Sequence, residues 1–429
     1  MKSAEISSGL LLISVVYSIF LAFSVSAAPL IIDHRHTDIT VLTREAIEQA
    51  KERLHIAYGH TSHGSQLTTG MAGLVEFANG GGLGLSLPAN IFAWNNGGTD
   101  GALDLHDSFM IGDAGGYPQW VDRTREYLDN PENSDVNVVI WSWCGQVSDK
   151  YRAGTLESEY LLPMTRLEQD YPQVKFVYMT GHAHIDEDAD TKAGNEIIRN
   201  YCRANEKILY DFNDIESYDP DGTYYEFPDD SCDYHANPWF SRIGNWAIEW
   251  QDSHVEGDDW YNCESAHSQP LNANRKAYAA WYLWAALAGW TPAGVDIHAS
   301  GGQTTVTEGG EGADYQFVLR SQPSGEVIID LDPDIQTDIP NGAGGALSLN
   351  FTPATWNIPQ RVQVTAVDDS WAEGQHMGTI SIRVTSSDRA YDGVEVDDIT
   401  VVIMDNDQQG DSHPIEGIRL LLLQRDEGE

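Results

Sequence analysis

Basic residues are scarce in this chain of 429 residues. Lysine and arginine together number 24 against 66 aspartate and glutamate residues, so the formal net charge is −42. A surface this acidic repels nucleic acid and anionic membranes, which argues against both as direct partners. Such acidity is typical of very soluble proteins, of proteins from salty habitats and of proteins with calcium sites.

Long apolar segments are also rare. The run Leu10–Phe23 follows Lys2 and is followed by the small residues Ser26, Ala27 and Ala28, the pattern of a signal peptide cleaved after Ala27. The run is shorter than the roughly 20 residues of a membrane span, so a transmembrane anchor is the less favoured alternative. We therefore expect residues 1–27 to be a signal peptide and the mature protein to be secreted or periplasmic, without a membrane span.

Cysteine occurs only four times, at Cys144, Cys202, Cys232 and Cys263. No two of them have the close spacing of zinc ligands, which disfavours a cysteine zinc site. Export permits disulfides, and four cysteines allow three pairings. We expect Cys232 to pair with Cys263, because both lie in loop-like sequence.

Helical and strand patterns alternate from about residue 38 to 290. Helical patterns cover residues 43–54, 66–77, 121–130, 156–170, 191–205 and 274–288, with Pro163 expected to interrupt the fourth. Strand patterns cover residues 55–59, 136–143, 174–180 and 207–212. Strands that alternate with helices predict an α/β domain with a parallel sheet covered on both faces.

The pattern changes to a period of two after Pro292. Apolar residues alternate in seven short segments, from Thr304–Val306 to Ile399–Ile403, separated by glycine, proline and aspartate turns. This predicts an all-β, immunoglobulin-like antiparallel sandwich. We expect residues 28–296 to form the α/β domain, 297–407 the sandwich and 408–429 a polar tail, with a linker at Gly294–Gly302.

Residues with catalytic chemistry follow the predicted strands. Ser62 lies in the turn between the first strand and its helix, Gln146 follows the strand 136–143, and His182 follows the strand 174–180. Glu264 and His267 come just before the last helix. Because active sites of open parallel sheets lie at the carboxyl ends of the strands, we expect these residues to lie close together.

This arrangement resembles the SGNH/GDSL hydrolases, from the first strand to the last helix of the first domain. That family places its nucleophilic serine after the first strand and its catalytic histidine before the last helix, with an acid three residues upstream. The resemblance implies a flavodoxin-like sheet, with Ser62 as nucleophile, His267 as general base and Glu264 as the carboxylate that orients the histidine.

The sequence departs from the family pattern at several positions. The Gly-Asp-Ser-Leu string is absent, so Ser65 is an alternative nucleophile. Asp258 or Asp259, in the same loop region as Glu264, is an alternative for the acid. The family asparagine of the oxyanion hole is also missing. The resemblance then implies an oxyanion hole built from the Ser62 backbone N–H, Gly112 or Gly115, and Gln146 or Ser142. We expect His60 and His182 to line the substrate pocket beside it.

Paired histidines suggest a different chemistry. The pairs are His34 with His36, His60 with His63, and His182 with His184, and two of them follow strands. Histidines near strand ends can bind zinc or iron, although no His-Glu-x-x-His motif is present. A metal-dependent hydrolase is therefore an alternative to the serine hydrolase.

The second domain resembles a Calx-beta module. The resemblance is carried by Val306–Gly310, Ala366–Asp369 and Ile403–Asp407. It implies a structural Ca2+ site, because calcium binds six to eight oxygen ligands that are mostly carboxylates. The implied ligands are Glu308, Asp368, Asp369, Glu373, Asp405 and Asp407, with solvated turn acids as the alternative.

Together these features predict a secreted serine hydrolase that cleaves ester bonds without a catalytic cofactor. The expected partner is an esterified small molecule or a polysaccharide, for which the enzyme would act as a carbohydrate acetyl esterase. The missing oxyanion asparagine keeps a second hypothesis open, a non-catalytic extracellular protein that binds glycan or matrix.

Overall fold

The computed structural model describes residues 29–407, apart from residues 109, 240, 300–303, 340–344 and 395. The expected signal peptide and the expected polar tail lie outside these described residues. Within them, no helix has both the length and the apolar character needed to cross a membrane.

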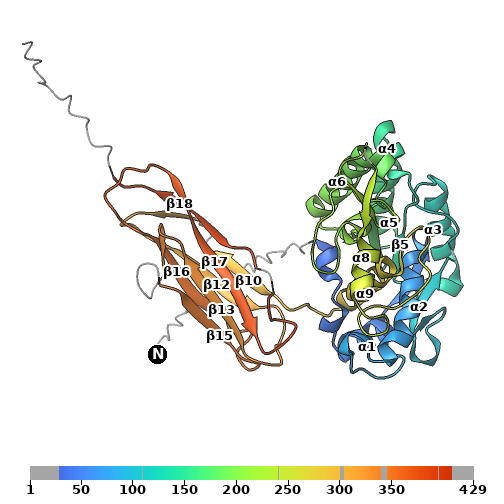
Figure 1. The fold of residues 1–429 in the computed structure, drawn as a ribbon, viewed down its shortest axis with the longest axis horizontal. Coiled ribbons are helices and arrows are strands. Elements are labelled where there is room, and N and C mark those ends of the chain that lie inside the picture. Colours follow the sequence, from blue (N-terminus) through green and yellow to red (C-terminus); the bar gives the residue numbers. More distant parts are fainter. Residues whose placement is uncertain are drawn as a thin grey trace, which may run out of the picture.

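A seven-stranded parallel sheet forms the centre of the first domain, shown on the right of Figure 1. Its order is β1-β7-β6-β5-β2-β4-β3. The inner strands β4, β2, β5, β6 and β7 follow the flavodoxin-like order 2-1-3-4-5, so the expected fold class is confirmed. The strand bounds are β1 Leu30–Ile32, β2 His55–Gly59, β3 Trp94–Asn95, β4 Leu103–Asp107, β5 Val138–Trp141, β6 Lys175–Met179 and β7 Ile208–Tyr210.

Helices cover the sheet (Figure 1). Their bounds are α1 Arg44–Arg53, α2 Ser65–Asn79, α3 Gln119–Asp129, α4 Val147–Ala153, α5 Leu162–Asp170, α6 Asp188–Ala204, α7 Phe212–Glu216, α8 Trp246–Ser253 and α9 Pro270–Leu287. The helical stretch expected over residues 156–170 changes at Pro163, because the α-helix α5 begins only at Leu162 and Pro163 lies in its first turn, where proline is tolerated. A π-helical turn, Glu157–Leu161, precedes it.

Helix α9 is buried along nearly its whole length, because it packs between α2, α1 and the edge of the sheet. Its contact with α2 depends on glycine. A Cβ atom at Gly70 would lie 2.1 Å from the carbonyl oxygen of Ala273. This close approach brings the segment before α9 to the start of α2, and so brings two distant parts of the sequence together.

The second domain is a sandwich of two sheets, with orders β10-β12-β16-β14 and β11-β18-β17-β13-β15. Among the described strands of this domain, all pairings are antiparallel except that of β11 with β18, and the core includes Phe317, Ile329, Phe351 and Val401. The predicted sandwich is thus confirmed. The strand bounds are β10 Val295–Ala299, β11 Thr305–Thr307, β12 Ala313–Leu319, β13 Val327–Pro333, β14 Thr337–Asp338, β15 Leu347–Phe351, β16 Gln360–Ala366, β17 His376–Ser386 and β18 Ile399–Met404.

The expected linker at residues 294–302 is wrong in its first half. Residues 295–299 form β10, which pairs with β12 from Val295 opposite Leu319 to Ala299 opposite Tyr315. Val295, Ile297 and Ala299 pack against the sandwich core, so the segment is a strand of period two rather than a tether.

The expected disulfide is also absent from the structure, in which all four cysteines are free thiols. Cys232 packs in a small cluster with Trp246 and Leu271, whereas Cys263 packs against the main core of the domain. Cys232 and Cys263 do not pair, because their side chains pack into two different apolar clusters.

Candidate functional site

Ser62 and His267 meet at the carboxyl edge of the sheet. Strand β2 lies between β4 and β5, where the strand order reverses, and such a switch point is where open α/β sheets bind ligands. Ser62 lies in the turn between β2 and α2, and its Oγ is 3.0 Å from Nε2 of His267. Both side chains are exposed, so the pair can reach a substrate.

The turn that carries Ser62 lies tightly against the end of β5. A Cβ atom at Gly64 would lie 2.3 Å from Oγ of Ser142, so only glycine fits there. The hydroxyl of Tyr58, on strand β2, donates to the Gly64 carbonyl at 2.8 Å and holds the turn against the strand. Ser65, the alternative nucleophile, donates its hydroxyl to the Ser62 carbonyl at 2.7 Å, whereas Ser62 is the serine that faces His267.

The backbone of His267 is in the left-handed region, with φ of 63°. Histidine and asparagine enter this region more readily than most residues, but the conformation still costs about 1 kcal/mol or more. The neighbouring carbonyl of Ala266 accepts a hydrogen bond from Nε2 of Gln66 at 2.5 Å. This contact holds the loop in the conformation that turns His267 toward Ser62.

The predicted acid Glu264 is exposed, and no hydrogen bond joins it to His267 among the described residues. Asp259 accepts the N–H of Val255 at 2.8 Å and so caps its own loop. The carboxylate that the structure does place near His267 is Asp230, whose oxygen lies within 4.8 Å of ring nitrogens of His63 and His267. The roles of Glu264, Asp258 and Asp259 stay predictions.

Three imidazole rings stack beside the serine. The ring of His63 lies 4.4 Å from that of His267 and 3.7 Å from that of His182. Burial opposes the charged form of His63, but hydrogen bonds to Asp230 and Cys144 raise its pKa to about 9. Burial and the neighbouring His63 lower the pKa of His182 to about 3. The stack therefore combines a cationic His63 with a neutral His182 near neutral pH.

His60 does not share this stack. Its Nε2 is 2.6 Å from Asp107 and 3.0 Å from Oγ of Ser108, at the end of β4. Its ring packs against Tyr58. His60 therefore supports the turn that carries Ser62, through its contacts with the end of β4. His182, the other predicted pocket residue, stacks on His63 and so lies close to Ser62.

Asp113 organises the expected oxyanion residues. Its carboxylate accepts hydrogen bonds from Oγ1 of Thr61 at 3.1 Å, from the N–H of Gly115 at 3.0 Å and from Nε2 of Gln146 at 3.2 Å. Gly115 and Gln146 are thus neighbours, whereas Gly112 faces Arg123. A primary amide carries two N–H groups, so Gln146 can donate one to Asp113 and one to a substrate.

A buried polar network connects the His267 loop with the His182 loop. Nζ of Lys276 donates at 2.6 Å both to Oε1 of Gln66 and to Glu216. Glu216 also accepts the N–H of Ala183, next to His182, while Gln66 holds Ala266, next to His267. Lys276, Gln66 and Glu216 are at most 1% exposed. Burial lowers the pKa of Lys276 and raises that of Glu216, and their mutual contact opposes both shifts.

The structure gives two of the three expected histidine pairs carboxylate partners. In these two pairs the rings face different carboxylates: His34 bonds Asp214, His36 bonds Asp33, His60 bonds Asp107 and His63 bonds Asp230. In the third pair, the ring centroids of His182 and His184 are 5.9 Å apart. The groups His63, Asp230 and His267 are close enough to share a metal ion. In this structure Nε2 of His63 is bonded to Asp230 and Nε2 of His267 is bonded to Ser62, an arrangement that suits proton transfer.

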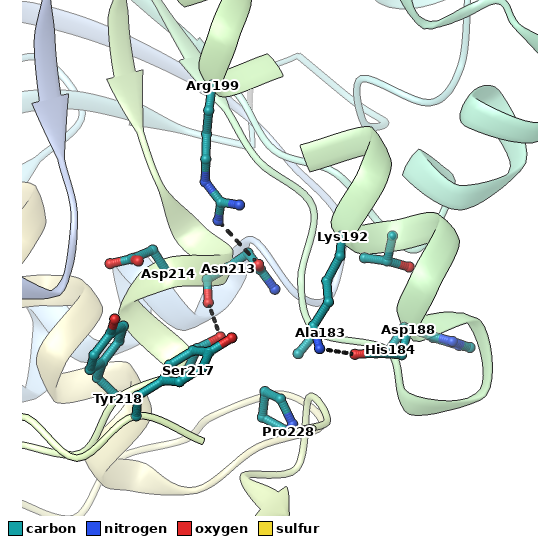
Figure 2. Close-up of a pocket in the computed structure, with 12 residues that line it drawn as sticks. Ala183, His184, Asp188, Lys192, Arg199, Asn213, Asp214, Ser217, Tyr218 and Pro228 are labelled. Carbon is teal, nitrogen blue, oxygen red and sulfur yellow. Dashed lines mark hydrogen bonds and ion pairs between the residues drawn. The ribbon is translucent and has the colours of Figure 1, made fainter. Parts of the chain in front are cut away.

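A pocket of about 200 Å³ is lined in part by Ala183 and His184, the two residues that follow His182 in the sequence (Figure 2). His184, Lys192 and Arg199 line it together with Asn213 and Tyr218. Its cations are engaged: Arg199 bonds Asp211 at 2.6 Å, and Lys192 lies 3.0 Å from Asp188. The pocket therefore borders the loop of the imidazole stack but does not contain Ser62.

Carboxylates converge at one end of the sandwich from the loops after β11, β16 and β18. Oxygens of Glu308, Asp405 and Asp407 lie within 4.8 Å of one another, and Glu373 forms a similar group with Glu308 and His376. Nδ2 of Asn406 connects the Glu308 carbonyl, at 2.7 Å, with Asp368, at 3.0 Å. Asp369 accepts the N–H of Trp371 in its own loop.

Two of these carboxylate oxygens are buried without a hydrogen-bond partner in the described part of the chain, Oε2 of Glu308 and Oδ2 of Asp407. Burial and the neighbouring Asp405 raise the pKa of both groups. Buried, crowded oxygens of this kind are the donors that a hard cation such as Ca2+ binds. The residues present therefore fit a calcium ion.

Several solved structures resemble parts of this chain. A GDSL-like lipase from Bacteroides thetaiotaomicron matches 49% of this chain and 89% of its own, with 13% identity and a TM-score of 0.25. An apo-form Calx CBD1 domain matches 26% of this chain and 98% of its own, with 22% identity and a TM-score of 0.20. A Calx calcium-binding CBD12 structure matches 27% of this chain and 48% of its own, with 23% identity and a TM-score of 0.20. No protein-family model and no curated protein sequence matches the chain.

Proposed function

We propose that the first domain is a serine hydrolase that cleaves ester bonds. The observation that carries this proposal is the 3.0 Å contact between Ser62 Oγ and His267 Nε2 at the switch point of the sheet. His267 accepts the proton of Ser62 as Oγ attacks the ester carbonyl, and passes it to the departing alcohol, which leaves an acyl-serine. Water then attacks this acyl group while His267 accepts its proton, the acid leaves, and Ser62 regains the proton.

The Ser62 N–H and the second amide N–H of Gln146 would donate to the oxyanion, and the cationic His63 adds favourable charge. The N–H of Gly115 is bonded to Asp113, so Gly115 would only hold Asp113 beside Gln146.

The proposed substrate is an ester on a large extracellular molecule, such as an acetylated polysaccharide. Ser62 and His267 are both exposed rather than enclosed, which suits a bulky alcohol that stays outside the protein. The proposed signal peptide places the enzyme outside the cytoplasm, where such polymers occur.

The proposal is tested by hydrolysis of short p-nitrophenyl esters and by covalent labelling with a fluorophosphonate, which reacts with activated serines. We expect chelator-resistant hydrolysis and a single label that peptide mapping assigns to Ser62. A label on Ser65 would move the nucleophile to that residue. Loss of hydrolysis on chelation would support the metal-dependent alternative, and absence of both hydrolysis and label would leave the glycan-binding hypothesis.

We also propose that the sandwich binds Ca2+ through Glu308, Asp405 and Asp407, with Asp368, Asp369 and Glu373 around them. The two buried oxygens without partners support this proposal. A bound calcium ion would remove the repulsion between the carboxylates and fix the three loops to one another, so it would stabilise the folded sandwich.

Calcium is expected to raise the free energy of unfolding of the sandwich by about 2.7 kcal/mol when its free concentration is 100 times Kd. Thermal unfolding of the full chain with calcium or with chelator measures this shift. Glu308→Gln should abolish it, whereas Glu311→Gln, at an exposed position in the same loop, should keep it. An equal shift in both variants would contradict the proposed site.

A further inference from the structure

A second potential nucleophile lies beside Ser62. Sγ of Cys144 is 4.0 Å from Ser62 Oγ and 3.5 Å from Nδ1 of His63. The other nitrogen of that ring, Nε2, is 3.0 Å from Asp230 Oδ2. A thiol, an imidazole and a carboxylate thus stand in a row, and this arrangement activates a cysteine nucleophile.

The three groups come from separate loops. His63 belongs to the turn after β2, Cys144 to the segment after β5, and Asp230 to the segment before the strand β8, Asp233–His235. Asn245 secures the Asp230 segment, because its Nδ2 donates to the Ser231 carbonyl at 2.8 Å. The row therefore depends on the tertiary fold, and none of its contacts is a local turn contact.

Cys144 differs from the other three cysteines. Burial raises the pKa of Cys232 and Cys263 to about 12 and raises that of Cys202 further. The hydrogen bond from His63 instead lowers the pKa of the Cys144 thiol. Cys144 is also partly exposed, next to the exposed Ser62. Reactive cysteines occur in such cationic, accessible surroundings, whereas buried thiols are inert.

We infer that Cys144, His63 and Asp230 form a second nucleophilic triad, which accepts acyl groups from thioesters and activated esters. The Cys144 thiolate attacks the acyl carbonyl, a C–S bond forms, and the bond to the leaving thiol or alcohol breaks as that group takes the proton of His63. Water then attacks the Cys144 thioester while His63 accepts its proton. The C–S bond breaks, the carboxylic acid leaves, and the thiolate–imidazolium pair is restored.

This second triad does not depend on the role of Ser62, because each nucleophile has its own base. Ser62 contacts His267, whereas Cys144 contacts His63, and the two rings stack without sharing a hydrogen bond. The nucleophilic atoms are only 4.0 Å apart, so an acyl group on one blocks the other.

The test uses the full-length Ser62→Ala protein, in which the serine reaction is absent. A short acetyl thioester is added, the reaction is quenched, and intact mass and peptide mapping locate the acetyl group. We expect one acetyl group on Cys144, removable by neutral hydroxylamine, and none in the Ser62→Ala, Cys144→Ala double variant. His63→Gln should slow acylation by about 10²–10⁴-fold. Acylation of Cys144 no faster than of Cys263 would overturn the inference.

A second measurement covers the case in which His63→Gln fails to fold. The rate of Cys144 alkylation by iodoacetamide is followed against pH in the wild type and in Asp230→Asn, with Cys263 as the internal control thiol. Asp230 stabilises the charged His63, which stabilises the thiolate, so Asp230→Asn should move the alkylation midpoint to higher pH. An unchanged midpoint would contradict the positioning role of Asp230. Failure of fluorophosphonate labelling at Ser62 would leave both results unaffected, so the two proposals fail separately.

Discussion

His267→Asn is expected to lower kcat/KM for ester hydrolysis by about 10²–10⁴-fold while the domain stays folded. Asparagine is chosen because it tolerates the left-handed backbone that His267 adopts, at φ of 63°. Its amide cannot accept the serine proton, so the nucleophile loses its base. Steady-state kinetics on p-nitrophenyl esters, together with circular dichroism and the Tm, measure the effect.

Two further variants show whether Ser62 and His267 act as a unit. Ser62→Ala should lose at least as much activity, and the double variant should be no worse than either single variant, because neither residue works without the other. Ser65→Ala is the matched control, since its hydroxyl bonds the Ser62 carbonyl instead of His267. Retained activity in His267→Asn would remove His267 as the base.

Lys276→Met is expected to lower the free energy of unfolding of the α/β domain by about 3–5 kcal/mol. Lys276 and Glu216 are 0% and 1% exposed, so loss of the lysine leaves a buried carboxylate without its counter-charge. The change also leaves Oε1 of Gln66 without its donor. Urea unfolding, followed by tryptophan fluorescence, measures the loss.

The double variant Lys276→Met, Glu216→Gln provides the control. It removes both charges, and its glutamine oxygen can still accept the N–H of Ala183, so most of the lost stability should return. The double variant should also hydrolyse esters faster than Lys276→Met does, because the network holds the loops of His182 and His267 in place. A loss below about 1 kcal/mol in Lys276→Met would show that water or another group compensates for the missing lysine.

The strands of the sheet differ in how well the sequence predicts them. Strand β2 has the bounds expected, His55–Gly59, because a central strand covered on both faces is a continuous apolar run. The sequence pattern does not predict strand β4, because this strand contains Asp104, a buried carboxylate that is bonded to His55 at 2.8 Å and to the N–H of Gly97 at 2.6 Å. Strands β1 and β3, of three and two residues, are too short to show a period.

The candidate site was predictable only where its residues adjoin regular elements. Ser62 follows a strand and His267 precedes a helix, so the sequence indicated both, and the structure places them 3.0 Å apart. Asp230 lies in a long irregular segment whose path depends on tertiary contacts such as that of Asn245. Lys276 and Arg275 are the two charged residues of the largely apolar helix α9, so the sequence marks both as unusual, but nothing local indicates Glu216 as the partner of Lys276.

The register of the sandwich determines how the domain would carry mechanical load. The chain enters at Val295, opposite the last residue of β12, and leaves after Met404, which pairs with Thr307 at the end where the carboxylates gather. A force that pulled the first domain away from the residues after Met404 would act along β18. It would load the hydrogen bonds of β18 to β17 and β11 in shear, so that they would have to break together. A calcium ion bound by Asp405 and Asp407 would hold the residues that follow β18 against the neighbouring loops. The ion would therefore raise the force needed to pull β18 out of its sheet.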